Sequence, residues 1–230
     1  MGHGYSLLGL STAVFVTSHL ALSSAPIRSA TVRRLGETHF LILYSVISVI
    51  ALSWMIMAYV KTPHDDFLWP PSPPLHTVPL FIMPFAAVLL VAGVTGKHPA
   101  GIQTRGAIDS SPNVNGILRI TRHPVQWSIV LWSLSHIIAN GDKSSVIFFG
   151  GFFLLAAVSS YLTDLKCKKQ VGNKTNEFAE MTSNLPFAAI ISGRNHLNIV
   201  EIGWPIIIVS ALLYGAILIL HPIIFRVTPY

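Results

Sequence analysis

The sequence predicts an all-α, polytopic membrane protein with about six transmembrane helices, and three observations lead to this fold class. The 230 residues are 52% hydrophobic and only 10% charged, whereas soluble domains carry about 25% charged residues. Several apolar segments approach the ~20 residues that cross a bilayer. No loop is long enough to suggest a second domain, so residues 1–230 are predicted to form a single transmembrane domain.

Six apolar runs give the predicted spans, over residues 4–24, 38–60, 76–95, 124–139, 144–163 and 203–222. The first run could be mistaken for a signal peptide, but no Lys or Arg precedes Arg28. We therefore expect a retained helix that Pro26 ends. The third run contains Pro79 and Pro84. Each proline removes a backbone hydrogen bond, which predicts a kink.

The connections between the spans are polar. A short loop after the first span holds Arg28, Arg33 and Arg34, and residues 96–118 form a second loop. In residues 164–202, the pieces DLKCKKQVG and NEFAEM predict a short amphipathic helix on the membrane surface, and LPFAAII is too short to cross. The single cysteine, in DLKCKKQVG, excludes an internal disulfide and a cysteine-based metal cluster.

The Lys and Arg residues are distributed unequally between the two predicted sides of the membrane. Twelve of the fifteen Lys and Arg residues follow the first, third and fifth spans, and only Lys61, Lys143 and Arg226 lie on the other side. Because cytoplasmic loops are enriched in Lys and Arg, both termini are predicted on the non-cytoplasmic side. The same bias explains the net charge of +6, so membrane lipids are the expected partners and nucleic acid is not.

One stretch, residues 117–142, carries a polar pattern on an apolar helix; it reads ILRITRHPVQWSIVLWSLSHIIANGD. Pro124 suits a first helical position, where its missing amide costs nothing. At about 100° per residue, one stripe of this helix holds Ser128, Trp132, Ser135, His136 and Ala139. Hydroxyl, indole and imidazole groups do not belong against lipid, so the stripe is predicted to face the bundle interior, a cavity or a cofactor.

Histidine is the ionisable residue of the predicted spans, which contain no Asp, Glu, Lys or Arg. This disfavours carboxylate proton relays and zinc or iron sites with carboxylate ligands. Four histidines (His3, His64, His98 and His196) lie in loops or tails, and six lie in or at the ends of spans: His19, His39, His76, His123, His136 and His221. One embedded histidine often bonds a carbonyl, but several without acidic neighbours favour haem b.

Four motifs resemble the NnrU family of membrane proteins, which includes plant and algal 15-cis-zeta-carotene isomerase. They are SHLALSSAPIR, the 117–142 stretch, TSNLPFAAIISGR and a final LHP, in the same order over about residues 15–225. The resemblance implies a haem b cofactor with His19 and His136 as axial ligands. Ser133 stands where the isomerase has a cysteine proposed as an alternate ligand, so ligand exchange of that kind is not expected.

The resemblance also implies a function. It points to redox-linked isomerisation of a lipophilic polyene, to nitric oxide and denitrification metabolism, or to electron transfer, in a bacterial or organelle inner membrane. A lipophilic small molecule or a redox partner would accompany these roles, and a larger membrane-protein complex is a further possibility. Arg122, His123 and Trp132 are the additional cofactor-binding candidates, with Arg122 suited to pairing with haem propionates.

Depth along the helices gives a different pairing of histidines. With both termini outside, His19 lies near the inner end of its span, whereas His136 lies about 18 Å along its helix at 1.5 Å per residue. By depth alone, His19 pairs with His123 and His136 with His221. The resemblance selects His19 and His136, and both pairings stay open at the level of sequence.

Two other functions are compatible with the sequence. RHP at a helix start, followed by the basic loop, is similar to membrane methyltransferases of the isoprenylcysteine carboxyl methyltransferase kind. In that case Arg122 and His123 would hold the carboxylate of S-adenosylmethionine, although the paired glutamates typical of that group are absent before the loop and only Asp164 is near. The third function is a non-catalytic subunit of a membrane complex, in which Gly150, Gly151 and Gly215 allow close helix packing.

Overall fold

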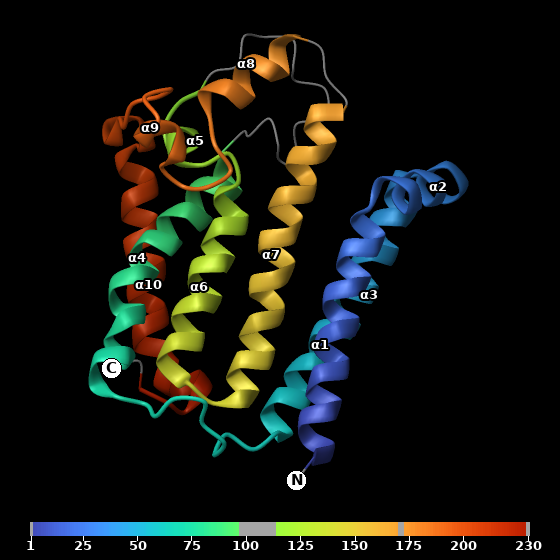
Figure 1. Cartoon of the computed structure of the whole chain (residues 1–230), viewed down its shortest axis with the longest axis vertical. Helices are drawn as coiled ribbons and strands as arrows, with labels where there is room; N and C mark the ends of the chain where they lie inside the picture. Colours follow the sequence, from blue (N-terminus) through green and yellow to red (C-terminus); the bar gives the residue numbers. More distant parts are fainter. Residues whose placement is uncertain (1, 97–113, 170–172, 229–230) are drawn as a thin grey trace. The chain divides into compact units, whose positions relative to one another are not determined.

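The computed structural model describes residues 2–96, 114–169 and 173–228. Within these ranges the chain is helical, and its β-structure is limited to an isolated bridge between Phe67 and Asp142. The long helices, shown in Figure 1, are α1 (Gly2–Ser23), α3 (Glu37–Lys61), α4 (Pro73–Thr95), α6 (Pro124–Asn140), α7 (Lys143–Lys169) and α10 (Trp204–Phe225). Each corresponds to one predicted apolar run, so the predicted all-α membrane fold is confirmed.

Five of the helices in the described part of the chain are long and apolar enough to cross a membrane: α1, α3, α4, α7 and α10. Helix α6 is shorter, at 17 residues. The total of six spans and the non-cytoplasmic position of the termini therefore remain predictions.

The prediction of a short loop after the first span is wrong, because these residues form a helix, α2 (Ala25–Leu35). Pro26 lies in the first turn of α2, where proline is tolerated because that amide has no partner within the helix. Arg33 and Arg34 lie in the last turn, where positive charge stabilises the helix dipole. Pro26 therefore begins a second helix immediately after α1 ends.

The predicted surface helix after the fifth span is half right. The DLKCKK piece continues α7 as far as Lys169, whereas NEFAEM lies in a separate helix, α8 (Asn173–Met181). The remaining elements are α5 (Ile117–Ile120), α9 (Ala188–Ile191) and the 3₁₀-helix η1 (Ile199–Ile202). The four residues of α9 confirm that LPFAAII does not cross a membrane. Lys97, His98 and Arg105 lie outside the described residues.

The chain divides into two compact units. The first contains Met1–His76 and His136–Leu155, and the second contains Thr77–Ser135 and Ala156–Tyr230. Helices α6 and α7 each contribute residues to both units. The units are described separately below.

In the first unit, α1 packs along α3, and the N-terminal part of α7 lies against both. Gly151 of α7 permits this approach, because a Cβ atom there would lie 2.5 Å from Cγ2 of Thr12 and 3.3 Å from Cε of Met55. Tyr59 of α3 stacks on Phe148 of α7 with ring centroids 4.3 Å apart. The predicted close packing is thus confirmed at Gly151, whereas nothing lies within 4 Å of a Cβ atom added at Gly150 or Gly215.

The connection between α3 and α4 is tied to the start of α7. Asp142 caps α7, because its Oδ1 accepts the Ser145 amide at 2.9 Å, and the same oxygen lies 3.0 Å from Nδ1 of His64. Trp69 donates its indole N–H to the Ile138 carbonyl at 3.0 Å. His64, which the sequence places in a loop, therefore has a buried acidic partner.

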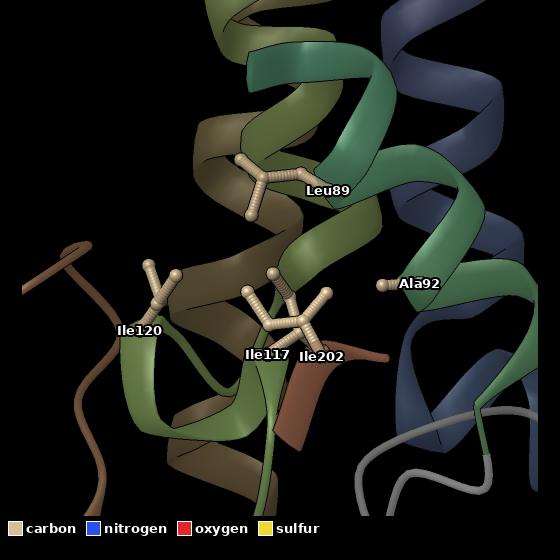
Figure 2. Close-up of a cluster of buried hydrophobic side chains, with 5 residues drawn as sticks. All are labelled: Leu89, Ala92, Ile117, Ile120 and Ile202. Carbon is tan, nitrogen blue, oxygen red and sulfur yellow. The ribbon is translucent and has the colours of Figure 1, made fainter. Parts of the chain in front are cut away.

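In the second unit, α4 packs against α6 and α10. A Cβ atom at Gly93 would lie 2.6 Å from a methyl group of Val125, and Tyr214 of α10 donates to the Leu80 carbonyl at 3.2 Å. A cluster of buried side chains, shown in Figure 2, joins α4, α5 and η1. Its members are Leu89, Ala92, Ile117, Ile120 and Ile202.

A bidentate ion pair fastens η1 beside α5. Arg119 donates from Nε and Nη2 to the two carboxylate oxygens of Glu201 at 2.6 and 2.9 Å. The Gly116 amide also donates to Glu201, at 2.9 Å. The Arg119 hydrogen bonds, and then that of Gly116, lower the pKa of Glu201 from 4.5 to about 2. The same pair raises the pKa of Arg119.

Adding a methyl group at Gly151 should weaken the first unit. In Gly151→Ala the new Cβ meets the stiff, β-branched Thr12, and overpacking of this kind costs about 1–3 kcal/mol. Gly150→Ala is the matched control, because nothing lies within 4 Å of its added Cβ. Denaturation in detergent micelles should show a loss for Gly151→Ala alone; equal stability of the two variants would contradict the close approach.

Stability should depend on Glu201 in acid. The pKa of Glu201 is depressed to about 2, so its ionised form stabilises the fold above pH ~4.5. That contribution is lost as the pH falls through the window from ~4.5 to ~2. Thermal unfolding in detergent should show Glu201→Gln below wild type by a few degrees at pH 7, with the difference shrinking across this window. A pH-independent difference would assign the effect to packing.

Candidate functional site

The turn that begins α6 belongs to the second unit and is built from buried polar groups. Thr121 is extended between α5 and α6 and is fully buried. Its hydroxyl donates to the Asn184 carbonyl at 2.6 Å and accepts the His123 amide at 3.2 Å. The turn is therefore held both by its own neighbour His123 and by the segment that follows α8.

Arg122 is bound on several sides. Its amide donates to the Ser183 carbonyl at 2.9 Å, and Nη2 donates to the carbonyls of Ala179 and Thr182 at 2.9 and 2.8 Å. Nη1 lies 3.6 Å from Oδ2 of Asp164. The guanidinium group therefore links α7 to the end of α8.

His123 is 2% exposed, and its Nε2 lies 2.5 Å from Oδ1 of Asp164. The other oxygen of Asp164 accepts the Asn184 amide at 3.4 Å, and Asn184 in turn accepts the Trp127 indole N–H at 3.1 Å. Asp164 is thus the centre of a shared, mostly buried network that includes Arg122 and His123.

The network joins two motifs that are 60 residues apart in the chain. TRHP supplies Thr121, Arg122 and His123, and TSNLPF supplies Thr182, Ser183 and Asn184. The Arg122–Thr182 contact spans that separation. In the described structure these two motifs form one site. The sequence showed only their order along the chain.

Asp164 was named from the sequence only beside the methyltransferase alternative, and its pairing with His123 and Arg122 was missed. The expectation of spans without acidic residues is wrong here, because Asp164 lies inside α7 near the end of its apolar span, Lys143–Leu165. The span had been ended at residue 163, where the apolar run stops. A signal was available, because no Gly or Pro lies between Gly151 and Gly172 to end the helix.

The polar stripe of α6 is turned inward as predicted. Ser128 and Ser135 are buried, and Trp132 and His136 are half-buried. Trp132 lies one turn before His136 on the same helix. Trp132, Arg122 and His123 belong to the second unit, whereas His136 belongs to the first.

His19 and His136 both lie in the first unit. Nδ1 of His19 lies 2.7 Å from the Phe15 carbonyl, one turn earlier in α1. Such a bond places the proton on Nδ1 and leaves the lone pair on Nε2, the arrangement that metal-bound imidazoles adopt. The His19 ring also contacts Tyr44, with centroids 5.7 Å apart.

A continuous series of ring contacts connects the two imidazoles. It runs from His19 through Phe15, Phe152, Phe148 and Phe149 to His136, with successive centroids 4.4, 5.1, 5.3, 5.1 and 4.9 Å apart. Imidazoles set among aromatic rings fit the donor chemistry of haem b. These phenylalanine rings are also the groups that would have to move apart to admit a porphyrin.

The depth-based pairs, His19 with His123 and His136 with His221, each have one member in each unit. His123 is engaged by Asp164, and Nδ1 of His221 lies 2.8 Å from the Val227 carbonyl. Among the residues that the structure describes, no group of three or more His, Cys, Asp and Glu side chains could hold a metal ion.

The methyltransferase function would use Arg122 and His123 to hold a carboxylate. In the structure both side chains already contact acceptors of the protein itself, namely Asp164 and two main-chain carbonyls. A bound carboxylate would have to compete with these contacts, so the geometry does not favour this function.

Comparison with known proteins gives one family. The NnrU protein family matches residues 7–229 of the chain. A chloroplastic 15-cis-zeta-carotene isomerase of Arabidopsis thaliana is 25% identical over 191 residues, covering 80% of this chain and 50% of that protein. The chloroplastic 15-cis-zeta-carotene isomerase of Zea mays is 34% identical over 82 residues, covering 36% and 22%. The chain thus spans about half the length of these relatives or less. No solved structure matches it.

Removing the charge of Asp164 should be far more costly than removing an exposed one. Asp164→Asn leaves the Arg122 charge without its carboxylate in a site that is 13–17% exposed. Breaking a largely buried pair in this way costs about 2–4 kcal/mol. The matched control is Asp66→Asn, whose partner Lys143 and own side chain are both about half exposed (45% and 46%).

The measurement is unfolding of the purified protein in detergent, monitored by circular dichroism. Asp66→Asn should stay close to wild type, because exposed ion pairs contribute little. Similar losses in the two variants would mean that the Asp164 network does not hold this unit together.

Proposed function

The chain belongs to the NnrU family, and from this premise we propose that it is a haem b-binding membrane protein that isomerises a lipophilic polyene. Its apolar helices fit contact with membrane lipid. The two plant relatives are named as chloroplastic 15-cis-zeta-carotene isomerases. A conjugated, water-insoluble substrate of that class suits a protein of this composition. We place it in an organelle or bacterial inner membrane.

The observation that supports this proposal is that aromatic rings contact both His19 and His136. His39 shows why these contacts matter, because its Nδ1 lies 2.9 Å from the Leu35 carbonyl in the same one-turn geometry as His19. His39 is exposed near the start of α3, whereas Phe15, which contacts His19, is 4% exposed. The ring contacts, rather than the hydrogen bond, distinguish His19 as a ligand candidate.

In this proposal His19 and His136 would hold the iron, and a bound haem would supply one-electron chemistry. The Phe15 carbonyl orients the His19 ring, and the Phe15 and Tyr44 rings pack against it. The phenylalanine rings are apolar, as the surroundings of a polyene would have to be, and they would have to move apart to admit one. Rotation about one double bond consumes no second substrate, so the protein need only position the polyene and keep water out.

His19→Ala and His136→Ala should each remove low-spin haem from the purified protein. Wild type in detergent should show a sharp Soret band and, after dithionite, split bands in the visible region, as two imidazole ligands give. His39→Ala is the matched control, because it loses the same type of hydrogen bond in an exposed position and should keep the spectrum.

An assay with a 15-cis polyene of the kind named for the relatives, read out by chromatography, tests the activity itself. We expect turnover by wild type and His39→Ala, and loss in His19→Ala. A colourless wild-type protein would contradict the cofactor. A haem protein that keeps both histidine ligands and leaves the polyene unchanged would contradict the isomerase and favour electron transfer.

A further inference from the structure

The segment between α8 and α10, residues 182–204, carries an unusual surface in the second unit. It contains α9 and η1 and leads directly into α10 (Figure 1). Its large apolar side chains are exposed: Leu185, Ile191, Leu197, Ile199, Val200 and Trp204. Ile191 and Val200 are 84% and 85% exposed, although neither lies in an apolar span. We call these six side chains the 185–204 apolar face.

Several polar side chains of this segment bond within the protein. Asn184 bonds Asp164 and Trp127, and Asn195 accepts Arg119 Nη1 at 2.7 Å and donates to the Met181 carbonyl at 2.8 Å. Glu201 is held by Arg119, as described above. A loop in water buries most of its large apolar side chains, so a segment that exposes six of them does not fit that setting.

The four residues of the 3₁₀-helix η1 include both a buried and an exposed apolar side chain. Ile202 is 8% exposed and packs with Leu89 and Ile117 in the cluster of Figure 2. Val200, two residues earlier, faces outward. The interior therefore already has its apolar contacts, and the outward apolar side chains add nothing to this core. They require a separate apolar environment.

The 185–204 apolar face is continuous with a membrane helix. Gly203 alone separates η1 from α10, and Trp204 is the first residue of α10 and 77% exposed. Helix α10 is a candidate span whose apolar side chains are themselves largely exposed, as lipid contact requires. Tryptophan is enriched where a span meets the lipid headgroups. Exposed Arg194 and His196 lie in the same segment, and cationic groups beside apolar ones suit that boundary.

We propose that the 185–204 apolar face is a lipid-docking surface, immersed at the boundary between headgroups and acyl chains beside the start of α10. The segment then lies in the membrane surface instead of forming a loop in water. Its polar side holds the Arg122–Asp164 network and the Arg119–Glu201 pair, and its apolar side contacts lipid. This inference does not depend on haem or on the isomerase activity.

The test uses the whole protein in lipid nanodiscs. In a Cys167→Ser background, single cysteines replace Ile191 or Val200 and carry an environment-sensitive fluorophore. Glu177→Cys, an exposed position on α8, serves as the water-facing control, and Leu212→Cys, 68% exposed on α10, as the lipid-facing one. Quenching is measured with iodide in the water and with lipids labelled near the headgroup or deep in the acyl chain.

We expect the labels at 191 and 200 to be quenched severalfold more by the shallow lipid quencher than the label at 177, and severalfold less by iodide. The label at 212 should respond most to the deep quencher. Iodide quenching at 191 and 200 equal to that at 177 would overturn the proposal. Protection from both quenchers would also overturn it, because the face would then be covered by protein, such as a second copy.

Discussion

The second unit depends on one constraint, which is that Asp164 must be paired. A carboxylate within an apolar helix is costly unless it is neutralised and hydrogen-bonded. Asp164 meets this requirement with His123, Arg122 and Asn184, which come from the start of α6 and the segment after α8. Neither α6 nor α7 can shift along its axis without separating these groups. The pairing therefore fixes the register of three elements at once.

The same use of polar groups determines the surface of the second unit. The chain has few charged residues, and in residues 182–204 several polar side chains bond within the protein, as in Arg119–Glu201 and Asn184–Asp164. The outward side of that segment is consequently rich in apolar side chains. A membrane protein can accept this arrangement, because lipid rather than water covers the apolar side. The internal ties and the lipid-docking surface are thus two consequences of one distribution of polar residues.

The sequence predicted the helices well and their contacts poorly, for a physical reason. Apolar runs are local, so length and periodicity located all six long helices. The pairing of His123 with Asp164 spans 41 residues, and that of Arg119 with Glu201 spans 82; no local pattern encodes either. The errors at Pro26 and Asp164 were both about where a helix begins or ends. Proline can follow one helix and open the next, and an apolar run can stop before its helix does.

The first unit shows why a ligand assignment cannot rest on a motif alone. His19 and His39 make the same bond to the carbonyl one turn earlier, so the backbone presents both rings alike. They differ in what surrounds them: a buried phenylalanine series leads from His19 to His136, whereas His39 is exposed. A neutral imidazole in an apolar setting gains more from a metal than one that water already solvates. The environment, which depends on the packing of α1 and α7 around Gly151, is therefore what distinguishes the His19 ring from that of His39, and the proposed ligand role of His19 rests on this difference.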